Sequence, residues 1–249
     1  MTDQTPGILL VTPVWNDSVR LSGFGADLAA TLADCPLPIR WIIADDGSRA
    51  DDRARLKDLR DSLAEVFPGV DLHLADAHRG KGSVVREAWA LAPEADWLAF
   101  VDADGSLAPS ELISLISMAI DAECTILAIR KRTATTTVVE SLWRGLAHRG
   151  FLLAARILLG LRCEDPQCGA KILRGEDYRR IAPLLREDGL AFDSELLTAL
   201  LQHGAEWLEI PVTWLEKKGG QVHPLRDSWG MLAALWRVRQ RLRAGDFTA

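Results

Sequence analysis

The first half of the chain alternates short apolar runs with longer helix-compatible stretches, and this alternation constrains the fold most. The apolar runs predict strands near residues 8–12, 39–44, 70–75, 97–101 and 125–129. The intervening stretches predict helices near residues 18–34, 51–65, 82–92 and 110–121. Because strands separated by helices usually pair in parallel, we expect an α/β fold with a mainly parallel central sheet flanked by helices. The second half is expected to be richer in helix.

Two of the apolar runs end in paired carboxylates. Asp102-Ala103-Asp104 follows the run 97–101, and Asp45-Asp46 follows the run 40–44 and precedes a Gly-Ser turn. Side chains two apart on a strand project to the same side, so Asp102 and Asp104 are candidate ligands for Mg²⁺ or Mn²⁺. Taken alone, an Asp-x-Asp triplet is more often a solvated turn. The interpretation as a metal site therefore depends on the neighbouring segments.

Two further polar segments are expected at the same edge of the sheet. Pro13-Val14-Trp15-Asn16 follows the first apolar run, which Pro13 is expected to stop. His78–Ser83 joins glycines to Arg79 and Lys81 directly before a predicted helix, a composition that suits a diphosphate. Ligands of open α/β sheets bind beyond the carboxyl ends of the strands, so these segments should converge on one crevice.

The order of these segments resembles family 2 glycosyltransferases of the GT-A fold, and within them the polyprenyl-phosphate (dolichyl-phosphate) sugar transferases. Downstream, Asp165–Lys171 resembles that subgroup's acid-x-x-Cys-Gly-x-Lys segment, and Phe192–Glu195 resembles its Phe-Asp-x-Glu segment. The resemblance implies a GT-A glycosyltransferase that uses a nucleotide-diphosphate sugar as donor and a polyprenyl phosphate as acceptor, with Mg²⁺ or Mn²⁺ as cofactor.

Within this subgroup the chain resembles dolichyl-phosphate glucosyltransferases more than mannosyltransferases. Gly80–Arg86 and Val222–Ser228 resemble glucosyltransferase segments, and Ser106 stands where mannosyltransferases tend to carry Gln. We therefore expect UDP-glucose rather than GDP-mannose as the donor. Gly220-Gln221 replaces the family's Ser-Lys pair, which removes a cation that could hold phosphate.

The resemblance also assigns roles to individual residues. Donor-binding residues are expected to be Pro13, Trp15, Asn16, Asp46, Arg79, Lys81 and Asp102, and the metal ligands Asp102 and Asp104. The expected catalytic residues are Asp104, Arg130, Arg144 and Asp193. Asp46 would accept from the base, and Arg130 and Arg144 would grip the acceptor phosphate. That phosphate is already ionised at neutral pH, so its attack needs no general base.

Two other functions remain open from the sequence. An enzyme of the same fold could use a soluble hydroxyl acceptor, and Asp193 or Glu195 would then be the candidate base. A non-catalytic nucleotide-sugar-binding membrane adaptor is the second, although an adaptor does not need the metal-binding pair and the two arginines together.

Composition limits the class of protein and its partners. The chain has 249 residues, of which 48% are hydrophobic, and this suits one large folded domain. Without repeats or linkers, we expect one GT-A domain over residues 1–249, with a nucleotide-sugar-binding half over about 1–105 and an acceptor-binding half over about 106–249. A net charge of −6 argues against a general nucleic-acid partner. The four cysteines include no C-x-x-C pair, which favours reduced thiols.

The sequence also predicts where the protein acts. The N-terminus lacks the basic and apolar regions of a signal peptide. The segment 150–161 is interrupted by Arg156 and is shorter than the roughly 20 residues of a transmembrane helix. The stretches 141–162 and 225–243 mix Trp and Leu with Arg, a pattern of helices that either lie in a membrane interface or pack on the core. With the lipid-acceptor resemblance, we expect a cytoplasmic protein peripherally associated with the inner face of a membrane.

Overall fold

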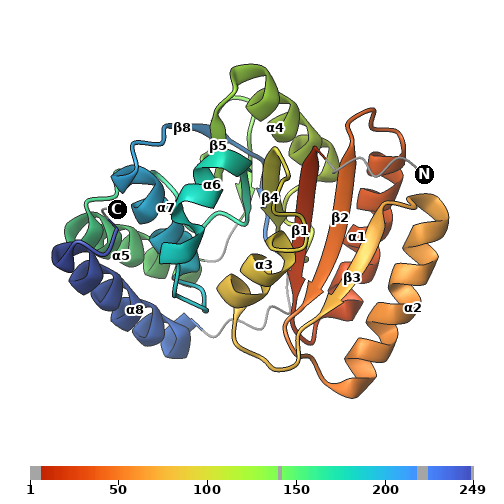
Figure 1. Ribbon diagram of the computed structural model, residues 1–249, viewed down its shortest axis with the longest axis horizontal. Coiled ribbons are helices and arrows are strands. Elements are labelled where there is room, and N and C mark those ends of the chain that lie inside the picture. The colour runs from red at the N-terminus through yellow and green to blue at the C-terminus, as the bar shows by residue number, and fades with distance from the viewer. Residues whose placement is uncertain (1–6, 140–141, 218–223, 248–249) are drawn as a thin grey trace.

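A seven-stranded sheet forms the centre of the molecule, with strand order β3-β2-β1-β4-β7-β5-β8 (Figure 1). The computed structural model describes residues 7–139, 142–217 and 224–247. The strands of the central sheet are β1 (Ile8–Val14), β2 (Ile39–Asp45), β3 (Val70–Leu74), β4 (Trp97–Val101), β5 (Thr125–Ile129), β7 (Ala170–Arg174) and β8 (Trp207–Pro211). A second, two-stranded sheet pairs β6 (Val138–Val139) with β9 (Trp214–Leu215).

Most strand pairs of the central sheet are parallel. β3, β2, β1 and β4 pair in parallel, and β8 pairs in parallel with β5. β7 is inserted between β4 and β5 and runs antiparallel to both, so β4 and β5 point the same way. The carboxyl ends of β1, β2, β4 and β5 therefore share one edge. This confirms the predicted mainly parallel α/β sheet, although the alternation of the first half does not predict β7 and β8.

Helices cover both faces of the sheet (Figure 1). One face carries α1 (Ser18–Ala33), α2 (Ala50–Val66) and α4 (Pro109–Ala122). The other face carries α3 (Lys81–Trp89), α5 (Leu142–Leu159), α6 (Gly175–Ile181), α7 (Phe192–Gln202) and α8 (Pro224–Ala244). Along β1, Leu9 and Val11 enter one core while Ile8 and Leu10 enter the other. Because both faces are buried, the strands read as continuous apolar runs.

Two boundaries of the strands and helices predicted in the first half differ from expectation by two or more residues. β1 continues through Pro13 to Val14, because the pairing of β1 with β4 ends at Val11 and the missing N–H of Pro13 interrupts no pairing on that side. α3 ends at Trp89, three residues earlier than expected. Pro93 disfavours helical backbone at Ala92, and the N–H groups of Leu91 and Ala92 form turn hydrogen bonds to Ala88 and Trp89 instead of continuing the helix.

α5 and α8 pack side by side on the far side of the fold from α2 (Figure 1). Arg239 of α8 donates to the carbonyl oxygens of Ile157 and Leu158 at the end of α5. A cation at a helix C-terminus is favourable, so this contact fixes the two helices together. Within the described ranges, no helix combines the length and the apolarity needed to cross a membrane.

Candidate active site

The carboxyl ends of β1, β2 and β4 bring the predicted donor residues together at one edge of the sheet. Asp46 follows β2, Asp102 follows β4, and Lys81 begins α3. Hydrogen bonds link Asp46 to the segment before α3, and an ion pair links Lys81 to Asp102. The expected convergence of the polar segments is therefore confirmed.

Asp46, which follows β2, accepts hydrogen bonds from the glycine-rich segment before α3. Its Oδ1 accepts the backbone N–H of Arg79 at 2.9 Å, and its Oδ2 accepts that of Gly80 at 2.8 Å. The Nδ1 atom of His78 lies 2.8 Å from the same Oδ2, which places the proton on that nitrogen. Gly80 has φ 126°, and a Cβ there would lie 2.5 Å from the carbonyl oxygen of Asp188. The backbone of this segment therefore requires glycine at position 80.

Trp15 lies beside this segment and stacks on His78, with ring centroids 4.0 Å apart and planes 15° apart. His78 was not among the expected site residues, although it opens the segment 78–83. Its contacts with both Trp15 and Asp46 make it part of the wall of the site. The Arg79 guanidinium pairs with Glu87 of α3, so contact between Arg79 and a diphosphate stays a prediction.

Asn16 and Pro13 belong to the turn that follows β1. Asn16 adopts φ 50°, donates its backbone N–H to Ser48 Oγ at 2.7 Å, and accepts the N–H of Arg49 at 2.9 Å through Oδ1. Asn16 therefore joins the loop after β1 to the loop after β2. Pro13 lies within β1 opposite Ala44. Direct contact of either residue with a donor stays a prediction.

Asp102 and Asp104 lie in the turn that follows β4. The Asp102 N–H donates to the Gly169 carbonyl oxygen at 2.8 Å, and a Cβ at position 169 would lie 2.2 Å from Asp102 Oδ2. Only glycine at position 169 leaves room for this carboxylate. Asp104 Oδ1 accepts the Ser106 N–H at 2.9 Å, and its Oδ2 lies 3.9 Å from Nη1 of Arg20 on α1. Arg20 was not expected in the site, because its partner is 84 positions away along the sequence.

The carboxylate pair fits a shared metal site. In the part of the chain that the structure describes, His, Cys, Asp and Glu form no group of three or more that could hold a metal ion. Hard divalent cations bind oxygen ligands, and Mg²⁺ usually takes one or two carboxylates together with phosphate oxygens and water. Asp102 and Asp104 are therefore suited to hold Mg²⁺ or Mn²⁺ against a donor diphosphate.

Among the described residues, Lys81 is the cation closest to this carboxylate pair. Its Nζ lies 2.8 Å from Asp102 Oδ1 and 3.6 Å from Asp193 Oδ2. Burial lowers the pKa of Lys81, but the charges of Asp102 and Asp193 outweigh burial and raise that pKa above its usual range. Burial raises the pKa of Asp102, and Lys81 opposes the rise. Lys81 is thus a cation beside the two candidate metal ligands.

Asp193, an expected catalytic residue, lies in the first turn of α7 and is buried. Its Oδ1 accepts a hydrogen bond from Nζ of Lys171 at 2.7 Å, and its side chain is 4% exposed. Lys171 also donates to the Cys168 carbonyl oxygen at 3.0 Å and is itself fully buried. The sequence motif 165–171 included Lys171, but the residue was given no role. Its pairing with Asp193 depends on the position of β7 in the sheet.

Arg130 follows β5 and is held by Asp165. Its backbone N–H and Nε donate to Oδ2 at 3.1 and 2.7 Å, and Nη2 donates to Oδ1 at 2.9 Å. The guanidinium also lies over the ring of Trp214, 5.7 Å from its centroid. Arg144 lies in α5, but its side chain falls outside the described part of the structure. The two arginines therefore stay predicted acceptor ligands.

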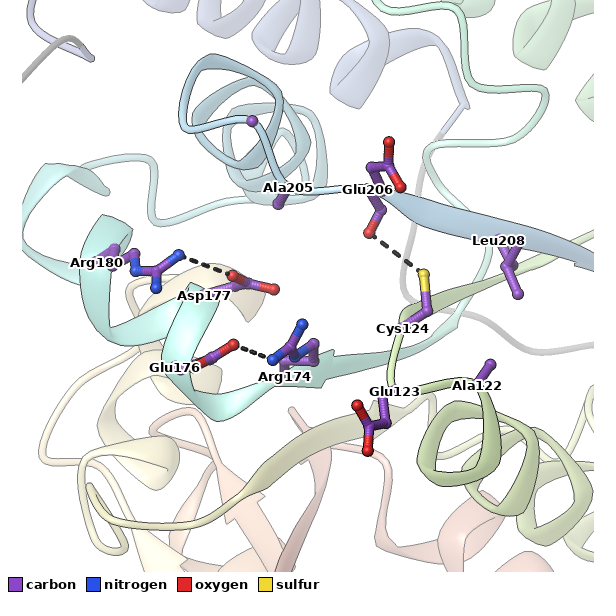
Figure 2. A pocket seen from close by; sticks show the side chains of 11 residues that line it. Ala122, Glu123, Cys124, Arg174, Glu176, Asp177, Arg180, Ala205, Glu206 and Leu208 are labelled. Atoms are coloured by element: carbon purple, nitrogen blue, oxygen red, sulfur yellow. Dashed lines mark hydrogen bonds and ion pairs between the residues drawn. The ribbon is translucent and has the colours of Figure 1, made fainter.

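A cavity of about 530 Å³ lies at the opposite edge of the sheet (Figure 2). It is lined by residues near the start of β5, the end of β7 and the start of β8, including Cys124, Arg174 and Glu206. Figure 2 shows that its arginines pair with neighbouring acids, Arg174 with Glu176 and Arg180 with Asp177. None of the predicted site residues lines this cavity, so it is separate from the candidate active site.

The family is established by a match to the model of glycosyl transferase family 2 over residues 10–178, which is more than half of the chain. The chain therefore belongs to glycosyltransferase family 2, and it is a glycosyltransferase. Its relatives include a dolichyl-phosphate beta-glucosyltransferase of Dictyostelium discoideum, 28% identical over 249 residues, with 95% of this chain and 75% of the relative covered. A polyprenol monophosphomannose synthase of Mycolicibacterium smegmatis is 28% identical over 247 residues, with 96% and 89% covered. These relatives match the predicted polyprenyl-phosphate sugar transferase subgroup.

Solved structures confirm the GT-A fold. Mannosyl-3-phosphoglycerate synthase from Rubrobacter xylanophilus superposes with TM-score 0.67 and 18% identity, covering 97% of this chain and 76% of that chain. Glucosyl-3-phosphoglycerate synthase from Mycobacterium tuberculosis, in complex with Mn²⁺, UDP and glucosyl-3-phosphoglycerate, superposes with TM-score 0.63 and 16% identity, covering 96% and 80%.

Proposed function

We propose that this protein transfers glucose from UDP-glucose to a polyprenyl phosphate, with inversion at the anomeric carbon and with Mg²⁺ or Mn²⁺, at the cytoplasmic face of a membrane. The observation that carries the proposal is the Lys81–Asp102 contact beside Asp104, because it joins a diphosphate-binding cation to a metal-binding pair. The names of the relatives support a polyprenyl-phosphate acceptor.

The contacts of Asp46 favour a uracil base. Each carboxylate oxygen accepts about two hydrogen bonds. Of the residues that the structure describes, Gly80 and His78 donate to Oδ2, whereas Arg79 alone donates to Oδ1. One acceptor position on Oδ1 suits the single N3–H donor of uracil better than the two adjacent donors of guanine. Stacked Trp15 and His78 form an aromatic wall beside this position.

Departure of the diphosphate is the difficult part of the reaction, because negative charge accumulates on it. A metal held by Asp102 and Asp104 would supply Lewis-acid stabilisation of that charge. Lys81 would add a fixed positive charge, and a preorganised charge or donor of this kind contributes about 3 to 4 kcal/mol in other enzymes. Asp104, tied to the Ser106 N–H, keeps its second oxygen directed toward Arg20.

The burial and the ion pairs of Asp193 favour a phosphate acceptor over a hydroxyl acceptor. A general base must reach the proton that it removes. Asp193 is buried and engaged by Lys171 and Lys81, so it is not placed to deprotonate a hydroxyl. Glu195 is fully buried and accepts from the backbone N–H groups of Arg186 and Glu187. A polyprenyl phosphate needs neither base, and Arg130 and Arg144 of the acceptor-binding half would hold its charge.

Peripheral membrane binding is proposed for the α5–α8 surface, the exposed apolar side chains of these two helices. Leu153 and Ile157 of α5 are 60% and 65% exposed, and Trp229 and Trp236 of α8 are 77% and 50% exposed. Arg149 and Arg156 lie on the same helix as the two aliphatic residues, which adds attraction to anionic lipid.

An acceptor panel tests the proposed function. The protein is incubated with UDP-glucose or GDP-mannose, Mg²⁺ or Mn²⁺, and either a short-chain polyprenyl phosphate or 3-phosphoglycerate. We expect a lipid-linked glucose product from UDP-glucose alone. Transfer to 3-phosphoglycerate but not to the lipid phosphate would establish the soluble-acceptor alternative, and nucleotide-sugar binding without any transfer would establish the adaptor alternative.

A further inference from the structure

Asp102, Lys81, Asp193 and Lys171 form a line of successive ion pairs of alternating sign next to the candidate donor site. Asp102 contacts Lys81 at 2.8 Å, Lys81 lies 3.6 Å from Asp193, and Asp193 contacts Lys171 at 2.7 Å. The ring of Phe100 supports both ammonium groups, with Lys81 Nζ 4.4 Å and Lys171 Nζ 5.2 Å from its centroid. Only the outer half of this line has a role in the proposed reaction.

The inner half of the line is too deeply buried to contact a substrate directly. The Lys171 side chain has no exposed surface and that of Asp193 has 4%, whereas that of Lys81 has 13% and that of Asp102 has 34%. Burying two ions costs several kcal/mol each, and a pair of apolar residues of similar volume is often as stable. A buried lysine–aspartate pair that touches a functional lysine therefore calls for an explanation beyond stability.

We propose that Lys171 and Asp193 are positioning residues that hold the Lys81 ammonium at the diphosphate-binding edge of the site. This inference rests on the proposed donor, a nucleoside diphosphate sugar. Asp102 is also a proposed metal ligand, so Lys81 would share its carboxylate with the metal. Asp193 is the second anchor, and Lys171 shares the charge of Asp193.

The shared charge accounts for the unequal distances around Asp193. Asp193 lies 2.7 Å from Lys171 but 3.6 Å from Lys81, so it attracts Lys81 without forming a close hydrogen bond with it. Without Lys171, Asp193 would be a buried carboxylate with Lys81 as its nearest cation. Lys81 would then close on Asp193 and withdraw from the diphosphate.

Comparison of UDP with uridine isolates this effect, since the two ligands differ only in the diphosphate. Lys171→Met removes the charge at similar length, and Lys171→Met/Asp193→Asn removes both charges of the buried pair. Dissociation constants for UDP and uridine are measured by calorimetry in the presence of Mn²⁺, and circular dichroism establishes that each variant is folded.

We expect Lys171→Met to weaken UDP binding about 10-fold, the lower end of the loss expected for one charge-assisted contact, and to leave uridine binding unchanged. The UDP affinity of the double variant should lie between those of the wild-type protein and Lys171→Met. Its neutral amide in place of the Asp193 carboxylate no longer draws Lys81 away from the diphosphate, but it also no longer anchors Lys81. A purely structural role would lower the affinities for UDP and uridine together.

The exposed pair Arg40 and Asp71, 2.8 Å apart on β2 and β3, provides the matched control as Arg40→Met/Asp71→Asn, which should alter neither affinity. A wild-type ratio of UDP to uridine affinity in the folded double variant would overturn the inference, even if Lys171→Met alone does not fold. Failure of the wild-type protein to bind UDP would overturn both the inference and the proposed donor.

Discussion

Arg130 and Asp165 form a bidentate ion pair, in which Nε of Arg130 lies 2.7 Å from Oδ2 of Asp165 and Nη2 lies 2.9 Å from Oδ1. The two residues are 35 positions apart in the sequence, and the Asp165 side chain is 3% exposed. A buried carboxylate thus fixes the plane of a guanidinium that is 18% exposed. Such a planar, oriented group suits recognition of a phosphate.

Replacement of Arg130 tests its role in acceptor binding. Arg130→Ala should slow transfer to polyprenyl phosphate by about 10- to 150-fold, the equivalent of one charge-assisted contact of about 1.5–3 kcal/mol. Calorimetric affinity for UDP should stay unchanged, since Asp46, Lys81 and Asp104 hold the donor. Arg130→Lys should rescue only part of the rate, and Arg144→Ala should behave like Arg130→Ala. Wild-type turnover in both alanine variants would remove these arginines from the acceptor site.

Metal dependence is tested at Asp104. Because Asp104 and Asp102 are the proposed protein ligands, Asp104→Ala should abolish glucose transfer, and excess EDTA should abolish it in the wild-type protein. The exposed Asp27 of α1 supplies the control as Asp27→Ala, which should retain full activity. Undiminished transfer in EDTA would contradict a metal-dependent mechanism.

Donor preference is tested by thermal unfolding. A ligand at 100 times its dissociation constant stabilises the folded state by about 2.7 kcal/mol. With Mn²⁺ present, UDP-glucose should raise the melting temperature more than GDP-mannose at the same concentration, because one acceptor position on Asp46 suits uracil. A larger shift with GDP-mannose would assign the protein to the mannosyltransferase branch.

Gly169 provides a steric test of the Asp102 position. Gly169→Ala would place a Cβ 2.2 Å from Asp102 Oδ2, so the carboxylate must move and metal-dependent UDP binding should fall. Gly150→Ala on α5 is the control, because a Cβ there meets nothing within 4 Å. That control should keep UDP binding and raise unfolding stability by about 0.5–1 kcal/mol. Equal UDP affinities in the two variants would contradict the close packing at Gly169.

Membrane binding is tested by sedimentation with anionic vesicles. Trp229→Ser/Trp236→Ser should lower the bound fraction, because both exposed indoles would lose their place among the lipid headgroups. Val19→Ser on α1, where the side chain is 71% exposed, should leave binding unchanged. Equal sedimentation of all three proteins would exclude the α5–α8 surface as the contact.

The donor side could be predicted because its residues directly follow strongly apolar strands. Asp46 and Asp102 each come at the end of such a run, and the parallel arrangement of β2 and β4 places them at one edge. The local sequence places each aspartate at the end of a strand. The rule that ligands of α/β sheets bind beyond the carboxyl ends of the strands then places both aspartates in one site.

The remaining contacts depend on pairings that local sequence does not specify. The Lys171–Asp193 pair requires β7 to enter the sheet antiparallel between β4 and β5. The Arg79 guanidinium turns to Glu87 because α3 places that acid within reach, while only its backbone N–H contacts Asp46. Sequence motifs identify residues such as Arg79, but they do not show whether the backbone or the side chain of the residue contacts the site.

The anomeric configuration and acceptor of the product distinguish the proposed inverting transfer to a lipid phosphate from every alternative reaction. UDP-glucose with the glucose C1 labelled with ¹³C is incubated with Mg²⁺ and a short-chain polyprenyl phosphate, and the product is analysed by NMR. We expect a β-linked glucosyl phosphate on the lipid, since inversion converts the α-linked donor. An α-linked lipid product, or the absence of any lipid-linked glucose under these conditions, would contradict it.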